Sequence, residues 1–359
     1  MSPKKHIINN PYDGQLSLDD DQDTVSDVMS FVSNFDKAKN SNVVLTEETA
    51  ETNRSIAPSV NIQTKDKISI TLLDKNVVNK GEQFLSMERK GSPVPITTKL
   101  NVSLDVDALL NEHPEIIIID NYEFDYFDKS VFDSFCSLIS AGNPYVTYAM
   151  IARNILGKPS NHHPSEKMIK NVEESILKMS RTEICIDLSD EYQNFPNVQK
   201  SLQKQNDSLY IQERLLNIRI VSANINGKNL RVLQPMSTPA LLQYAMLKRQ
   251  ISTFSNETLN TPTNKNRASI SCQKFLLQRI GMIKSSQKIS RAILFSSIYK
   301  IYPDYEEKKD DPTAFRSLTR ATQRNVCAIL DYWKKIGFIK DYKIIGQKGI
   351  KYHKIEIDA

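Results

Sequence analysis

Four side chains in the C-terminal part of the sequence are spaced as a base-reading surface would require. Arg316, Arg320 and Arg324 recur every four residues, and Gln323 lies among them. On an α-helix, which turns by about 100° per residue, all four fall on one side. A guanidinium can donate two hydrogen bonds to guanine, and a glutamine amide can form a matching pair with adenine. The spacing indicates sequence-specific DNA recognition, although an exposed face with arginines chosen for helix propensity stays open.

These side chains need a long helix to carry them, and the sequence predicts one from Thr313 to Lys335. Asp311 is a typical N-cap residue, Pro312 suits the first helical position because its missing N–H needs no partner there, and Gly337 predicts the end. The core-facing stripe of this helix, about 150° from the arginines, consists of Phe315, Leu318, Thr322, Val326, Ile329, Leu330, Trp333 and Ile336. No acidic residue lies one turn away from the arginines until Asp331, so we expect them to face outward unpaired.

Two further basic residues follow on a predicted β-hairpin. Residues 338–345 and 350–357 are β-patterned runs, and Gly346–Gly349 joins them. Lys348 lies at the tip of the hairpin, and Lys351 lies close to it. A hairpin beside a recognition helix can contact phosphate, so we expect these lysines to do so. A lysine-bearing turn without any ligand stays open.

A second DNA-binding candidate lies in the middle of the chain, on a helix predicted from Ser165 to Arg181. Its apolar stripe consists of Met168, Ile169, Val172, Ile176 and Met179. The candidate DNA contacts on its polar sides are Lys167, Lys170, Asn171 and Lys178. Glu166, Glu173 and Glu174 dilute this charge, so contact with DNA and contact with a protein both stay open, with DNA slightly favoured.

The elements around this helix predict a winged helix-turn-helix module. Asp128 is the expected N-cap of a first helix, and Thr147 is the expected N-cap of a second, Tyr148–Leu156. The third helix and a strand of sequence TEICIDL follow. Asn226-Gly227 then lies between two β-patterned runs and is the strongest hairpin signal in the chain. Three helices followed by a β-hairpin is the order of a winged helix-turn-helix.

The same order of elements recurs in the C-terminal third. Residues 238–250 predict a connecting helix, Asn266–Lys284 and Ser290–Tyr302 predict two more, and the arginine-bearing helix and its hairpin complete the module. The sequence thus predicts an α+β protein with two tandem winged helix-turn-helix modules. The expected domains are a disordered acidic leader (1–60), a short β-rich arm (61–115), a first winged-helix domain (116–236) and a second, basic winged-helix domain (237–359).

The distribution of charge separates these domains. Residues 1–58 carry ten acidic and five basic side chains, whereas residues 262–359 carry nine acidic and twenty basic ones. The leader is rich in Asn, Asp, Ser and Thr, a composition that buries too little apolar surface to fold on its own. A compact basic region favours a polyanionic partner such as DNA, although a solvated lysine-rich surface would carry the same charge.

Several classes of site are disfavoured by what the sequence lacks. Cys136, Cys185, Cys272 and Cys327 have no C-x-x-C spacing and predict reduced thiols. His162-His163 has no further ligands nearby in the sequence, so we expect no metal site. No phosphate loop or other catalytic signature occurs, so we expect neither a cofactor nor an enzymatic activity. The start of the chain has no signal-peptide core, and no apolar run could span a bilayer, so we expect a cytoplasmic protein without membrane contact.

Three stretches, residues 131–159, 166–191 and 326–357, resemble proteins carried by plasmids and other mobile elements of low-GC Gram-positive bacteria. Their layout is also similar to that of plasmid replication initiators with tandem winged-helix domains. The resemblance covers roughly residues 95–359. It implies a protein that binds repeated origin sequences, with the second module reading the major groove. The residues that it puts at recognition-helix and wing positions are Arg316, Arg320, Arg324 and Lys348.

Three functions fit these patterns. The first is a replication initiator that binds repeats in double-stranded DNA and recruits host replication proteins. The second is a transcriptional regulator of a mobile element, which would bind an operator as a homodimer. The third is a scaffold whose winged helices bind proteins. Two different modules in one chain favour the first over the second, because a dimeric regulator needs only one, and the basic helix argues against the third.

Overall fold

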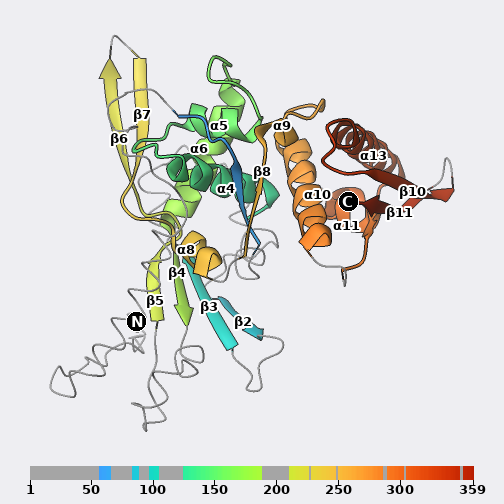
Figure 1. Cartoon of the computed structure of the whole chain (residues 1–359), viewed down its shortest axis with the longest axis horizontal. Helices are drawn as coiled ribbons and strands as arrows, with labels where there is room; N and C mark the ends of the chain where they lie inside the picture. The colour runs from blue at the N-terminus through green and yellow to red at the C-terminus, as the bar shows by residue number, and fades with distance from the viewer. Residues whose placement is uncertain are drawn as a thin grey trace, which may run out of the picture.

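The computed structural model describes residues 56–65, 83–88, 97–104, 124–187, 210–225, 228–247, 250–285, 289–302, 305–347 and 351–359. Most of the predicted leader lies outside these ranges. Helices and strands are mixed and enclose two hydrophobic cores (Figure 1). We name the elements around the first core the first unit. The second unit runs from α10 (Arg267–Ser285) to β11 (Lys351–Asp358). Among the described helices, none is long and apolar enough to cross a membrane.

The first unit is built on three helices and a β-hairpin. These elements are α4 (Tyr126–Ser140), α5 (Tyr148–Ile155), α6 (Glu166–Arg181), β6 (Ile218–Ile225) and β7 (Lys228–Pro235). The two strands pair antiparallel from Ile225 opposite Lys228 outward, which confirms the predicted hairpin. Val146, between α4 and α5, forms a β-bridge with Leu233 of β7, so the hairpin contacts the segment that joins these two helices.

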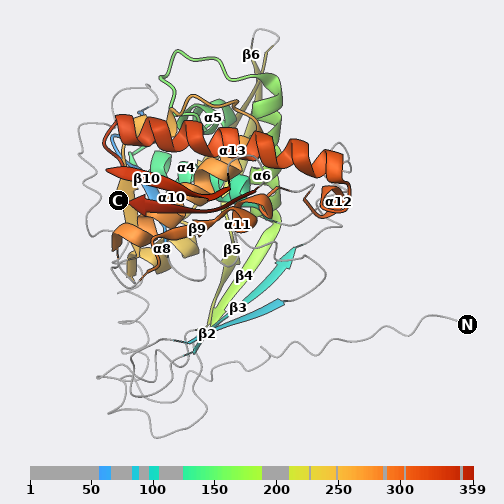
Figure 2. The same ribbon diagram turned by 90° about the vertical axis from the view of Figure 1, so that its right-hand side faces the viewer.

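A four-stranded antiparallel sheet combines two strands that precede α4 in the chain with two that lie between α6 and this hairpin. Its strands, in spatial order, are β2 (Gln83–Glu88), β3 (Thr97–Leu104), β4 (Thr182–Asp187) and β5 (Tyr210–Arg214). β4 starts directly after α6, as predicted, and Leu215 and Leu216 after β5 are buried in the first core. The predicted β-rich arm therefore supplies β2 and β3 to a sheet that extends away from the helices (Figure 2).

Four short elements form the junction between the units. They are β1 (Asn61–Thr64), α8 (Ala240–Leu247), β8 (Ile251–Phe254) and α9 (Asn256–Leu259). β1 pairs antiparallel with β8 and is buried along its whole length against α4. Ala240, Leu241 and Leu242 of α8 are buried in the first core, which therefore continues past residue 236.

The second unit repeats the order of the first. Its elements are α10 (Arg267–Ser285), β9 (Ala292–Leu294), α11 (Phe295–Tyr299), α12 (Tyr305–Lys308), α13 (Pro312–Lys335), β10 (Asp341–Gln347) and β11 (Lys351–Asp358). The strands form an antiparallel sheet in the order β10-β11-β9, with Ile355 opposite both Ile344 and Ile293. In both units the second strand of a hairpin pairs back on a short extended segment between the first two helices. Val146 is that segment in the first unit.

Capping residues in the sequence predict the starts of two helices. Thr147 and Asp311 accept backbone N–H groups at the start of α5 and α13, as predicted, and Ser165, which was predicted as the first residue of its helix, caps α6. The prediction for α4 was wrong by one turn. Asp125 is its N-cap, and Asp128 is the third helical residue, which accepts a hydrogen bond from the Asp125 backbone N–H. The two aspartates form a reciprocal capping box.

Residues 290–302 do not form the single helix that was predicted. Ala292–Leu294 are the strand β9, and only Phe295–Tyr299 are α-helical. The apolar spacing in this segment suits a helix, but β9 pairs with β11, the last strand of the unit in the sequence. This long-range pairing outweighs the local helical pattern.

Candidate nucleic-acid interface

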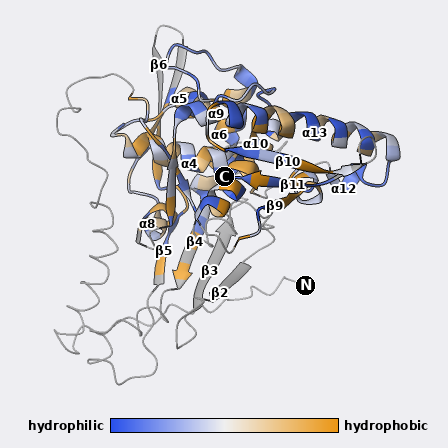
Figure 3. Cartoon of the chain, turned by 45° about the vertical axis from the view of Figure 1, so that its right-hand side comes forward, coloured by the Kyte–Doolittle hydropathy of each residue, from blue (hydrophilic) through white to orange (hydrophobic). Residues whose placement is uncertain are grey.

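The arginine ridge, defined as Arg316, Arg320 and Arg324, lies along the exposed side of α13. All three side chains are exposed, whereas Val326 and Ile329 on the other side of the helix are fully buried. Figure 3 shows the hydrophilic residues along the outer side of this helix. No ion pair between described residues involves the arginine ridge. Three guanidinium groups in a row therefore face outward.

Aromatic contacts fix the orientation of α13 at both of its ends. Near its start, the ring of Phe315 lies edge-on to Tyr299 of α11 and Tyr305 of α12, with centroids 6.1 and 6.3 Å apart. Near its end, Trp333 is fully buried, and its indole Nε1–H donates to the Thr258 carbonyl of α9 at 2.8 Å. These contacts determine which side of α13 the arginines occupy.

Gln323 lies at the contact between α13 and α11 and is half-buried. Its Nε2 donates a hydrogen bond to the Tyr299 hydroxyl oxygen at 2.9 Å. Burial raises the pKa of Tyr299, and the hydrogen bond from Gln323 lowers it in part. The hydroxyl therefore stays neutral and accepts this bond at neutral pH. This bond holds the Gln323 amide against α11 and uses one of its two N–H donors.

The hairpin that follows α13 has the predicted strands. β10 and β11 pair from Asp341 opposite Asp358 to Gln347 opposite Lys351, with an irregularity at Gly346. Lys348 lies outside the described residues. The contact of Lys348 and Lys351 with phosphate stays a prediction.

Two of the four candidate residues on α6 are accessible. Lys167 and Lys170 are exposed near the start of this helix, and Asn171 is half-buried. In Figure 1, α6 and α13 lie on opposite sides of α9 and α10.

Lys178 is buried, and the prediction that it contacts DNA was wrong. Its Nζ lies 2.5 Å from Asp128 Oδ2 and 4.8 Å from the ring centre of Phe124. Burial raises the pKa of Asp128, but Lys178 and Arg267 outweigh this and lower it below its ordinary value. A helical wheel of α6 alone puts Lys178 on a polar side. It does not show that α4 covers this side near the end of α6.

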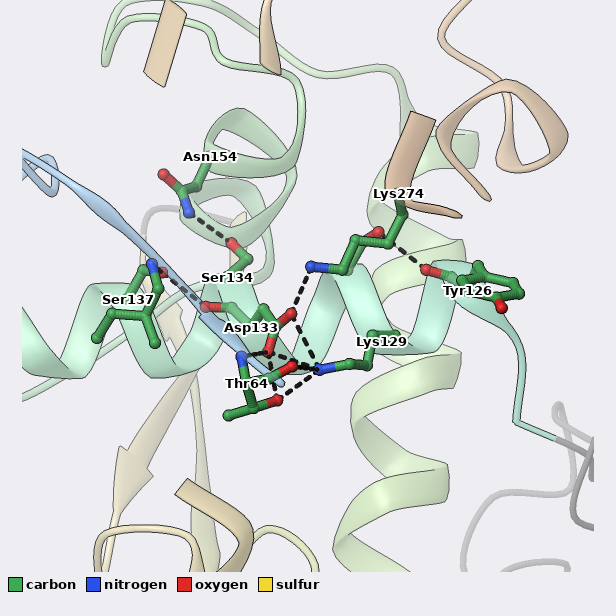
Figure 4. A network of polar contacts seen from close by, with 10 residues as sticks. Thr64, Tyr126, Lys129, Asp133, Ser134, Ser137, Asn154 and Lys274 are labelled. Atoms are coloured by element: carbon green, nitrogen blue, oxygen red, sulfur yellow. Dashed lines mark hydrogen bonds and ion pairs between the residues drawn. The ribbon is translucent and has the colours of Figure 1, made fainter. Parts of the chain in front are cut away.

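A buried ion network between α4 and α10 was not predicted. Asp133 accepts hydrogen bonds from Lys129 at 3.1 and 3.2 Å, from Lys274 of α10, and from the Thr64 hydroxyl at 3.1 Å (Figure 4). Burial raises the pKa of Asp133, but Lys129 and Lys274 lower it below its ordinary value. Two buried ammonium groups therefore share one carboxylate. The spacing of Lys129 and Asp133, four residues apart, was the only signal for this network in the sequence.

A second set of charges joins the same two helices. Arg267, the first residue of α10, contacts Asp125 at 2.9 Å and Asp128 at 3.6 Å, and its guanidinium lies 4.9 Å from the ring centre of Phe127. Tyr126 of α4 also packs edge-on against Phe275 of α10. The first helix of the second unit is thus held on the first helix of the first unit.

Comparison with known proteins finds solved structures of similar arrangement. Two of them are crystal structures of domains 2 and 3 of RctB, one of a selenomethionine derivative. Each is 12% identical to this chain and covers 81% of it, with 97% and 95% of their own lengths matched and TM-scores of 0.42 and 0.39. No protein-family model and no curated protein matches the sequence.

Proposed function

We propose that this protein binds double-stranded DNA sequence-specifically, with α13 in the major groove, and acts as a replication initiator of a plasmid or other mobile element. The arginine ridge is the observation that carries the proposal. An α-helix fits the major groove, and an outward arginine can span the acceptor pair of a guanine. Arg316, Arg320 and Arg324 are exposed and form no ion pair within the described part of the chain. Such a partner would place the protein in the bacterial cytoplasm.

We further propose that each unit is a winged helix. The order of the second unit supports this, because α10, β9, α11 and α13 are followed by a hairpin whose last strand pairs with β9. The first unit has the same order, with Leu233 paired to Val146. α13 and α6 are then the third helices of their modules, which is the position of a recognition helix. The β10–β11 hairpin would be the wing.

Two units in one chain favour an initiator over a dimeric regulator. The ion pairs between α4 and α10 hold the units together, so one chain can contact two adjacent segments of duplex. An initiator would select direct repeats and bind each with one chain, and it would recruit host replication proteins there. A regulator would select an inverted repeat and bind it as a homodimer.

Selection from random duplexes tests the proposal and identifies the site. Affinities for the selected duplex and for an unrelated one are then measured with a variant in which Arg316, Arg320 and Arg324 are alanine. Each base-reading arginine contributes about 1–3 kcal/mol of discrimination. We therefore expect the preference for the selected duplex to fall at least about a hundredfold.

A matched control removes the same charge from a different place. Lys335, Lys340 and Lys343 are exposed beyond the arginine ridge, at the end of α13 and the start of β10. Their replacement by alanine should leave the preference for the selected duplex unchanged. If the triple arginine variant stays folded and discriminates as the parent does, α13 is not the reading helix and the proposal fails. Sedimentation of the complex then shows whether one chain or two chains bind each site, which distinguishes the initiator from the dimeric regulator.

A further inference from the structure

The chain after α5 runs directly against α9 of the junction. Gly157 ends α5 with a φ of +62°, and a Cβ at this position would lie 2.7 Å from both the Asn256 carbonyl oxygen and the Asn260 nitrogen. Only glycine fits here, because the contact is with backbone and the conformation is left-handed. The contact places Lys158, the next residue, beside the end of α9.

Lys265 approaches the same place from the segment between α9 and α10. It lies two residues before α10, and its Nζ donates to the Leu259 carbonyl at 3.3 Å and to the Thr261 hydroxyl at 3.2 Å. The carbonyl carbon of Leu259 is also near Gly157, since a Cβ at Gly157 would lie 3.0 Å from it. Two lysines more than 100 positions apart in sequence are thus brought to one end of α9, and both are half-buried.

Within the described part of the chain, this lysine pair has no ion-pair partner. None of the ion pairs between described residues includes Lys158 or Lys265. Burial and the nearby charge of Lys158 lower the pKa of Lys265 to about 8. Two half-buried ammonium groups that repel each other would be stabilised by an anion between them.

The position of the pair indicates which anion. α5, α9 and α13 lie along one side of the molecule in two views (Figures 1 and 3). In Figure 1, α9, whose end carries the pair, lies between α6 and α13, the proposed reading helices of the two units. We propose that Lys158 and Lys265 form a phosphate-binding subsite that holds a backbone phosphate of the DNA duplex bound by α13. This inference rests on the proposed function and adds a contact at the junction of the units.

Salt dependence of binding tests the subsite. In the variant Lys158→Gln, Lys265→Gln, the plot of log affinity against log salt should become less steep by about one, which is the contribution of one phosphate contact. Affinity at 0.1 M salt should fall about tenfold, and equally for the selected and the unrelated duplex. The variant Lys158→Arg, Lys265→Arg keeps both charges and should retain most of the affinity. Thermal melts check that each variant is folded.

The opposite end of α10 offers a matched control pair. Lys284 and Lys340 also lie close together, since Lys340 contributes to lowering the pKa of Lys284. Lys284 is near the end of α10, whereas Lys265 precedes its start. The double glutamine variant of Lys284 and Lys340 should keep the salt slope of the parent. The junction variant is the double variant Lys158→Gln, Lys265→Gln. If the control variant lowers the salt slope as much as the junction variant does, the change in slope comes from net charge and the subsite is refuted.

Two further outcomes separate this inference from the proposed function. If the junction variant keeps the parent's slope while the arginine variant loses discrimination, DNA binding stands and the subsite is wrong. If the parent binds no duplex, the proposed function fails, and the subsite fails as a DNA contact. Inorganic phosphate then tests the pair itself. Phosphate would then raise the melting temperature of the parent above its value in chloride of equal ionic strength, and would not do so in the junction variant. This result would assign the lysine pair to a free anion instead of DNA.

Discussion

Replacement of Asp133 by alanine tests whether the buried network holds the two units together. The carboxylate is 3% exposed, and Lys129 and Lys274 share it from 0% and 5% exposed positions. Without it, both ammonium groups stay buried and lose the ion pairs that Asp133 forms with them. Removal of one partner of a buried ion pair costs about 3–5 kcal/mol, so we expect a loss of at least about 3 kcal/mol in the free energy of unfolding.

Replacement of Lys274 by methionine should have a much smaller effect. Asp133 has two ammonium partners, so the loss of Lys274 does not leave the carboxylate without a counter-charge. Asp133 would still accept hydrogen bonds from Lys129 and from Thr64. Methionine replaces the buried stem of the lysine with apolar atoms of similar length. We expect the free energy of unfolding to stay within about 1 kcal/mol of the parent value.

Urea unfolding with two probes measures both effects. Trp333 is the only tryptophan of the chain and is buried in the second core, so its fluorescence follows the second unit. Circular dichroism follows both units. We expect the two transitions to coincide in the parent and to separate in Asp133→Ala, because α10 loses its partner on α4. If both variants lose equal stability, or Asp133→Ala loses less than about 1 kcal/mol, this account of the network is refuted.

Four further results are expected. Trp333→Ala should cost about 3–5 kcal/mol of stability in denaturant titrations, since the buried indole is lost, and a cost below about 1 kcal/mol would contradict the packing. Gly157→Ala should cost about 1–3 kcal/mol, whereas a neutral result would show that α5 and α9 can separate without loss. DNA affinity should fall as the pH rises through about 8, where Lys265 loses its proton, and Lys265→Gln should lack this step. The purified protein should show no ATPase, nuclease or nicking activity, and magnesium-dependent nicking of an origin plasmid would contradict this.

Local interactions explain what could be predicted from the sequence. Thr147 and Asp311 were predicted to cap their helices because a cap depends only on backbone groups within one turn. The outward side of the arginine ridge was predicted for a similar reason. The apolar stripe of α13 faces a single core, so its periodicity determines which side is exposed.

Interactions between distant segments explain what could not be predicted. Lys178 is buried by Asp128, fifty positions away, and the strand β9 depends on β11. Lys158 and Lys265 meet only because both units contact α9. The reading of bases by Arg316 and its neighbours stays a prediction, because it concerns a ligand as well as a fold.

The pairing of β1 with β8 has a consequence for biosynthesis. Asn61–Thr64 leaves the ribosome early, but its partner Ile251–Phe254 follows almost 190 residues later. At about 5–20 residues per second, β1 waits roughly 10–40 s for its partner. During this time the nascent first unit has a strand with an unpaired edge, which is open to association with other chains. A fragment that stops at residue 236 would keep this state permanently, because it lacks both α8 and β8.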